Sequence, residues 1–150
     1  MKRIFISIAL VLACVGFAFG AGKLKVALSL GQETEERWQR EIAMFEDYFG
    51  KNGVDFFHQG ASYDANKQIS QCENFLTRGV NALIVQPCDA DALAVVADEA
   101  KKAGVPVIVY DQPLNSKNVT FLVTFDAVET GQLIAQYTFK QAPKGNYVIL

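Results

Sequence analysis

Short apolar segments that can form strands recur along the chain, and an amphipathic segment follows each of them. The expected strands begin near residues 23, 54, 80 and 105. This interval corresponds to one strand-helix-strand unit, and successive units of this kind build a parallel sheet. The continuous apolar run 82–85 is typical of a strand that is buried on both faces. The pattern therefore predicts an α/β fold, with an open parallel sheet and helices on both of its faces.

Local signals predict where the elements begin and end. Strands are expected over 23–30, 54–59, 80–86, 105–110, 119–125 and 145–150. Residues that can cap a first helical turn precede the segments between them, namely Thr34, Asp64, Asp89 or Asp91, and Asp126 with Glu129 three residues later. Gly79 and Gly104 stand where the second and third helices should end.

The amino terminus has the pattern of an export signal. Lys2 and Arg3 precede an apolar run over 4–19, and small residues follow at 20–22. Ala18-Phe19-Gly20 has the small residues of a signal-peptidase site. We therefore expect a signal peptide over 1–20, a mature start at Ala21, and a function outside the cytoplasm.

Two alternatives for this segment stay open. The apolar run is near the lower limit for crossing a membrane, so an uncleaved anchor is one alternative. The other is a lipoprotein, because Val11-Leu12-Ala13-Cys14 loosely resembles a lipobox in which Cys14 would carry the lipid. We rank the lipoprotein below the cleaved signal because the apolar run continues past Cys14.

The charge pattern argues against a nucleic-acid partner. The formal net charge is −2, and removal of Lys2 and Arg3 would make the chain more acidic. The pair Lys101-Lys102 is the largest basic cluster after the signal. A nucleic-acid partner requires a basic stripe, which is absent from the sequence.

The cysteines that follow the signal are Cys72 and Cys88. A disulfide between them is possible in an oxidising compartment. We favour free thiols, because Ile69, Cys72 and Leu76 share a helical face that should point into the core.

In open parallel sheets, ligands bind beyond the carboxyl ends of the strands, where the strand order reverses. Five segments follow predicted strands and are candidates for such a site: 31–38, 60–64, 86–89, 111–113 and residue 126. We interpret Asp64, Asp89 and Asp126 as helix caps, because each of them precedes a predicted helix.

Three residues in these segments have side chains suited to a sugar. Asp111 precedes no helix and could accept hydrogen bonds from two hydroxyls of one ligand, the alternative being an Asx-turn before Pro113. Arg37 could donate several hydrogen bonds to hydroxyl oxygens. Trp38 could stack on the C–H face of a sugar ring, and its spacing from Ile42 fits a position in the core equally well.

Patterns of catalysis and of cofactor binding are missing from the sequence. His58 lies inside the second predicted strand, and no serine or cysteine has a local nucleophile motif. The glycine pattern of a dinucleotide site and the phosphate loop of nucleoside triphosphatases are also absent. Cys72, Cys88 and His58 do not have the spacing of a zinc site. We therefore expect a protein that is not an enzyme, with no metal and no cofactor.

Several strings along the chain resemble one family. They are Glu36-Arg37-Trp38-Gln39, Arg78-Gly79-Val80, Leu83-Ile84-Val85-Gln86-Pro87, the run from Gly104 to Asp111, and Thr124-Phe125-Asp126 with Gly131. In order and spacing these strings resemble the periplasmic sugar-binding proteins of ABC importers, with the xylose-binding proteins nearest and the ribose-binding proteins more distant. The resemblance covers residues 23–150.

The resemblance implies a role for each candidate residue. In the family, two similar α/β domains close around a monosaccharide. Arg37 and Trp38 match positions that hydrogen-bond to the sugar and stack on it, and Asp111 matches the carboxylate that binds ring hydroxyls. Gln86 matches a position that lines the cleft in some members. Gln112 stands where the family commonly has arginine, so an amide replaces a cationic fork.

The resemblance also implies a division of the chain. We expect a signal peptide over 1–20, a sugar-binding domain over 21–125, and the hinge crossing with the start of a second domain over 126–150. Because the family encloses its sugar between two domains, we expect the 150-residue chain alone to bind sugars weakly or not at all. Its last 25 or so residues should be loosely held.

The leading hypothesis is a monomeric solute-binding protein that captures a xylose-like pentose in the periplasm. It would deliver the sugar to the permease of an ABC transporter. Alternatives are a periplasmic sugar sensor for a chemoreceptor or membrane kinase, and a non-functional fragment of a binding protein. Sugar-responsive repressors share this core, but a signal peptide stands where their helix-turn-helix would be.

Overall fold

The computed structural model describes residues 22–148, so the expected signal peptide, the start at Ala21 and a lipid on Cys14 lie outside the described residues. Its strands are β1 (Lys25–Leu30), β2 (Asp55–Gly60), β3 (Ala82–Gln86), β4 (Val107–Tyr110) and β5 (Phe121–Val123). Its helices are α2 (Glu36–Lys51), α3 (Ala65–Thr77), α4 (Ala94–Lys102) and α5 (Ala127–Gln141).

The strands form one parallel sheet in the order β2-β1-β3-β4-β5. Lys25 of β1 lies opposite Asp55 of β2, and Val26 of β1 lies opposite Ala82 of β3. The chain moves outward from β1 to β2 and then crosses back over β1 to reach β3. The order therefore reverses between β1 and β3, which is the position where a crevice opens beyond the carboxyl ends of the strands.

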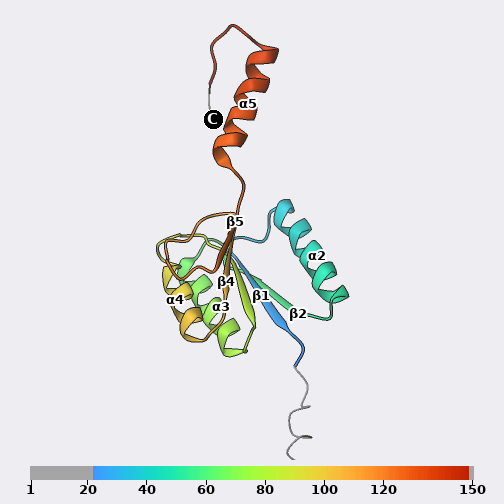
Figure 1. The fold of residues 1–150 in the computed structure, drawn as a ribbon, viewed down its shortest axis with the longest axis vertical. Coiled ribbons are helices and arrows are strands. Elements are labelled where there is room, and N and C mark those ends of the chain that lie inside the picture. Colours follow the sequence, from blue (N-terminus) through green and yellow to red (C-terminus); the bar gives the residue numbers. More distant parts are fainter. Residues whose placement is uncertain (1–21, 149–150) are drawn as a thin grey trace, which may run out of the picture.

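Helices cover both faces of the sheet, which confirms the predicted fold class (Figure 1). On one face, α2 packs through Trp38 and Ile42 onto Leu28, Leu30 and Ile84. On the other face, α3 and α4 bury the larger cluster, which includes Cys72, Phe75, Leu83, Val85, Val96, Val107 and Val109. Burial of these apolar side chains on both faces stabilises the sheet.

Predicted caps are confirmed for two helices. Asp64 accepts a hydrogen bond from the backbone N–H of Lys67 at 3.0 Å, and Asp126 accepts one from Glu129 at 2.9 Å. Gly79 has a φ of +70°, a left-handed conformation that glycine adopts readily after a helix.

The prediction that Thr34 caps the first helix is wrong. The helix begins at Glu36 after the N-cap residue Glu35, whose side chain makes no capping hydrogen bond. The side-chain oxygen of Gln32 accepts from the backbone N–H groups of Glu33 and Thr34 at 2.7 and 3.0 Å. This local turn places Thr34 outside the helix.

The start of α4 also differs from the prediction. Asp89 accepts hydrogen bonds from the backbone N–H groups of Asp91 and Ala92 at 3.0 and 2.8 Å, so it caps a turn. The α-helix itself begins only at Ala94. Asp91 instead accepts a hydrogen bond from the side chain of Asn115, which holds the loop before β5.

A buried amide joins the carboxyl ends of β1 and β3. Gln68 of α3 is fully buried, and its Nε2 donates to Ser29 Oγ at 3.2 Å and to the carbonyl oxygen of Gln86 at 2.9 Å. Its Oε1 accepts from the backbone N–H of Cys88 at 3.0 Å. This one side chain therefore sets the path of the chain as it leaves β3.

Cys72 and Cys88 are both free, as predicted. Cys72 packs in the core with Ile69 and Leu76. Burial raises the pKa of the Cys72 thiol to about 12, so the thiol stays protonated at neutral pH.

The last elements extend away from the sheet. β5 has no buried residue, and α5 lies beyond the carboxyl ends of the strands with none of its side chains buried (Figure 1). The predicted strand over 145–150 is not found over 145–148, because no neighbouring strand lies beside that segment; residues 149–150 lie outside the described residues. Within 22–148, no helix has both the length and the apolar character needed to cross a membrane.

Replacing Gln68 with leucine should destabilise the domain. The substitution leaves the N–H of Cys88 without its acceptor. It also removes one of the two donors to the carbonyl oxygen of Gln86, which keeps the N–H of Gly31 at 3.0 Å. We expect the free energy of unfolding to fall by about 2–4 kcal/mol, measured by urea denaturation. Asn66→Leu, at an exposed position of the same helix, is the control and should change it little. Equal stability of the Gln68→Leu protein and the parent would contradict this role.

Amide hydrogen exchange should separate α5 from the rest of the chain. We expect amides of Ala127–Gln141 in the 150-residue chain to exchange much faster than those of β1 and β3, since tertiary burial supplies most of a helix's stability. Mass spectrometry of peptides from both regions measures the difference. Equal protection of α5 and β3 would show that α5 packs against the domain.

Candidate functional site

A pocket of about 270 Å³ lies at the carboxyl ends of the strands, where the strand order reverses. It brings together all five side chains that the sequence predicted for the site: Arg37, Trp38, Gln86, Asp111 and Gln112. They come from the start of α2, from the end of β3, and from the turn after β4. The segments that carry them are far apart in the sequence and meet because parallel strands end at one edge of the sheet.

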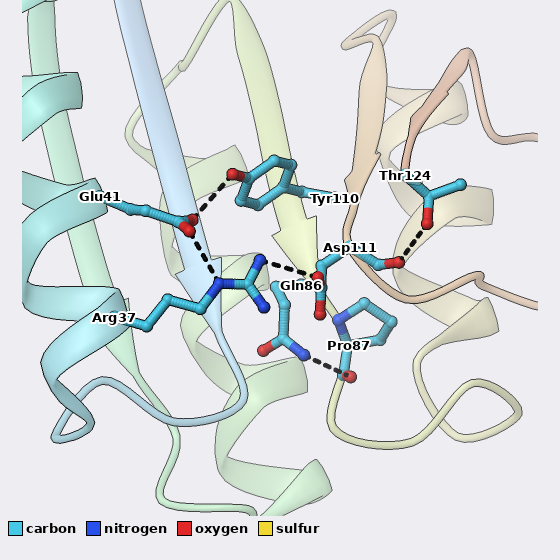
Figure 2. A network of polar contacts seen from close by, with 7 residues as sticks. All are labelled: Arg37, Glu41, Gln86, Pro87, Tyr110, Asp111 and Thr124. Carbon is cyan, nitrogen blue, oxygen red and sulfur yellow. Dashed lines mark hydrogen bonds and ion pairs between the residues drawn. The ribbon is translucent and has the colours of Figure 1, made fainter. Parts of the chain in front are cut away.

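Arg37 is held between two carboxylates, as Figure 2 shows. Its Nε donates to Glu41 Oε1 at 2.8 Å, and its Nη2 donates to Asp111 Oδ1 at 2.8 Å. The hydrogen bonds with Glu41 and Asp111 raise the pKa of the Arg37 guanidinium. The guanidinium therefore remains charged and oriented, with further N–H groups that do not point at either carboxylate.

Glu41 also binds Tyr110 at the end of β4. The Tyr110 hydroxyl donates to Glu41 Oε2 at 2.8 Å, so one carboxylate bonds both α2 and β4 (Figure 2). Burial, and then the hydrogen bond with Glu41, raise the pKa of Tyr110. The result is a chain of polar contacts from Tyr110 through Glu41 and Arg37 to Asp111.

The backbone of Asp111 is fixed by the last residue of β5 and by the residue that follows it. Its N–H donates to the carbonyl oxygen of Val123 at 2.8 Å, and its own carbonyl accepts from Thr124 Oγ1 at 2.7 Å (Figure 2). Its φ is +69°, a left-handed conformation that aspartate tolerates better than most residues. The carboxylate pairs with Arg37 at 2.8 Å, so it serves as the partner of a cation and not as the acceptor of a turn before Pro113.

Trp38 lies in the core and also lines the pocket. The residue is 5% exposed, and it packs with the apolar side chains of β1 and β3. The Arg37 Cζ atom lies 4.4 Å from its ring centroid, a cation-π contact that occupies part of the indole. Of the two interpretations of Trp38, its position in the core is the one that this burial favours.

Gln86 and Gln112 differ in how free their side chains are. Gln86 is buried, with its Oε1 accepting from the backbone N–H of Gly31 at 2.9 Å and its Nε2 donating to the carbonyl of Pro87 at 3.3 Å. Its amide therefore ties β1 to β3 beneath the pocket. Gln112 is exposed at the edge of the pocket.

Four further residues line the pocket that the sequence did not single out: Glu35, Tyr63, Pro87 and Cys88. The Tyr63 hydroxyl donates to Glu35 Oε1 at 2.8 Å, which raises the pKa of Tyr63. Partial burial raises the pKa of the Cys88 thiol. All four lie in segments that follow predicted strands. The sequence therefore predicted the segments that contain them, but not these residues.

Other parts of the surface do not share these features. A larger hollow, of about 360 Å³, lies between the segments that lead into β4 and β5, at the amino ends of these strands. It contains none of the predicted site residues.

His58 lies in β2 as predicted, 3.4 Å from Glu46 and 3.7 Å from Glu33, and does not line the pocket. In residues 22–148, no group of histidine, cysteine and acidic side chains is large enough to hold a metal ion.

Comparison with known proteins assigns the family. A model described as a periplasmic binding protein domain matches residues 26–150. The D-xylose-binding periplasmic protein of Haemophilus influenzae is 35% identical over 127 residues, which cover 85% of this chain and 38% of the relative. The protein of the same name from Escherichia coli K12 is 30% identical over 150 residues, covering 100% of this chain and 46% of the relative.

A solved structure gives the same result. It is an ABC transporter solute binding protein from Clostridium phytofermentans with bound β-D-glucose, 29% identical, with a TM-score of 0.74. The match covers 79% of this chain and 37% of that protein. The chain thus spans less than half the length of these relatives. From the family match and the shared fold, the chain belongs to the periplasmic binding protein family.

Proposed function

We propose that this chain contributes one half of the binding cleft of a protein that captures a monosaccharide of the pentose, xylose-like class in the periplasm. The sugar would then pass to the permease of an ABC transporter. The single observation that carries the proposal is the Arg37–Asp111 pair at the reversal of strand order. The names of the relatives, which include two D-xylose-binding proteins, support the class of ligand.

The pair has the chemistry that a sugar hydroxyl requires. A hydroxyl can donate its proton to the Asp111 carboxylate while its oxygen accepts an N–H from Arg37. Hydrogen bonds to charged groups are shorter and stronger than those between neutral groups. The hydrogen bond to Glu41 already orients the Arg37 guanidinium, so less entropy is lost in ordering it when the sugar binds.

Under this proposal the second half of the cleft comes from another domain. We propose residues 21–125 as the first sugar-binding domain and residues 126–150 as the hinge crossing with the start of the second. Hinge closure of two domains around a ligand is a common way to remove the ligand from water. The exposed apolar side chains of α5, such as Leu133 and Ile134, would then find their partners in that second domain.

The proposed protein binds its sugar and releases it unchanged. In support, Asp111 is paired with Arg37, and the raised pKa of the Cys88 thiol keeps it protonated and therefore a weak nucleophile. We also propose that it acts as a monomer without a cofactor, after export by the signal over 1–20.

Replacing Asp111 with asparagine should weaken sugar binding. Asparagine tolerates the left-handed backbone at this position, so the fold should survive while the charged acceptor is lost. We expect the dissociation constant of the full-length protein for its best sugar to rise roughly 10–100-fold. Calorimetry with a panel of pentoses and hexoses, D-xylose included, measures the change.

Asp47→Asn is the matched control, because Asp47 lies on the exposed side of α2 and, within residues 22–148, its ion pair is with Lys51. It should leave the affinity unchanged. If the parent protein bound none of the sugars in the panel, the proposed function would be wrong.

Replacing Arg37 with lysine tests the positioned guanidinium. A lysine keeps the positive charge, but its single ammonium group lacks the planar fork that contacts Glu41 and Asp111 at the same time. We expect the affinity for the sugar to fall about tenfold or more, with little change in stability. Arg40→Lys, at an exposed position on the same helix, should bind as the parent does. Equal affinity of the Arg37→Lys protein and the parent would show that charge alone is sufficient.

A further inference from the structure

Strained backbone gathers at the candidate pocket. In residues 22–148, the non-glycine residues with a positive φ are Ser62, Tyr63 and Asp111, at 57°, 60° and 69°. Two of them, Tyr63 and Asp111, line the pocket. A bulky side chain is rare in the left-handed region, because its Cβ approaches the carbonyl oxygen. Tyr63 therefore occupies a position where glycine would have the lower conformational cost.

Two hydrogen bonds hold Tyr63 in this conformation. Its backbone N–H donates to the carbonyl oxygen of Gly31 at 2.7 Å. Its hydroxyl donates to Glu35 Oε1 at 2.8 Å, and Glu35 is the N-cap residue of α2. The side chain thus reaches from the turn after β2 to the start of α2, two segments that border the pocket.

Burial does not compensate for the strain. Tyr63 is 62% exposed, so its ring contributes little to the core. Strained residues persist where the surrounding contacts hold them, as these two hydrogen bonds do, and they cluster at active sites and ligand sites.

The pocket otherwise lacks a free aromatic surface. Trp38, the aromatic residue predicted from the sequence to stack on a sugar, is 5% exposed and carries Arg37 over its ring. Tyr110 does not line the pocket, and its hydroxyl donates to Glu41. Tyr63 is thus the lining residue whose ring is both aromatic and open to a ligand. A flat apolar face of this kind packs well on the C–H side of a sugar ring.

We propose that Tyr63 is a specificity-determining residue of the pocket, whose ring, held by Glu35, forms the aromatic surface on which the sugar packs. This inference rests on the proposed sugar-binding function and assigns the stacking role to Tyr63 in place of Trp38. Asp111 and Arg37 would bind the hydroxyls at the edge of the ring, while Tyr63 covers its C–H face.

Tyr63→Gly in the full-length protein is the decisive variant. If Tyr63 is a strained residue that binds sugar, the substitution should lower the affinity without lowering the stability. Glycine removes the strain, so the midpoint of thermal unfolding should stay level or rise by about 2–4 °C. The ring is lost, so the affinity for D-xylose, or for the best sugar of the panel, should fall about tenfold. A residue with only a structural role would not lower the affinity while the stability is kept.

Two further variants refine the test. Tyr63→Phe keeps the ring but loses the hydrogen bond to Glu35, so its affinity should lie between those of the parent and of Tyr63→Gly. Tyr48→Ala removes an exposed tyrosine from α2 outside the pocket and should leave the affinity unchanged. Calorimetry gives the affinities, and thermal unfolding without sugar gives the stabilities.

The outcomes separate this inference from the proposed function. If the parent binds a sugar and Tyr63→Gly binds it equally well, the role of Tyr63 is overturned and the proposed function stands. If the parent binds no sugar of the panel, the proposed function fails, and the stacking role fails with it. A large fall in the unfolding midpoint of Tyr63→Gly would also overturn the inference, because it would mean that Tyr63 stabilises the fold.

Discussion

The buried amide of Gln68 is the interaction on which the pocket depends. It bonds to Ser29 in β1, to the last residue of β3, and to the N–H of Cys88 beyond that strand. A buried polar group without a partner costs about 1–3 kcal/mol. A different path for the chain after β3 would break these hydrogen bonds, so it is disfavoured. The strand order reverses between β1 and β3, and the amide therefore fixes the geometry of the sheet where the pocket forms. Gln86 adds a second tie, by accepting from Gly31 beneath the pocket.

Above this base, the cation of the pocket is already paired with carboxylates. Arg37 neutralises Asp111, and Glu41 holds Arg37 in place. A neutral ligand with many hydroxyls suits such a site, because it can bond to both members of the pair without adding charge. The strained backbone at Tyr63 and Asp111 lies at the same rim. Order is thus built into the pocket before a ligand arrives, which reduces the entropy lost on binding.

Much of the fold followed from local signals. Asp64 and Asp126 cap the helices that they were predicted to cap, because a short acid before an amphipathic segment needs only the backbone of the next turn. Predictions failed where a distant or competing partner decided the structure. Thr34 does not cap α2, because its N–H bonds to the Gln32 side chain in a turn before the helix. The segment 145–148 forms no strand, because no strand lies beside it to pair with.

The sequence by itself determined the α/β class, the order of elements, and the segments that meet at the pocket, because periodicity and caps act within a few residues and parallel strands share one edge. Only the tertiary structure decided how the side chains in those segments are used. It buried Trp38, paired Arg37 with a carboxylate 74 positions away, and left Tyr63 open at the rim. Those outcomes depend on distances between residues that are remote in sequence, which the local pattern does not encode.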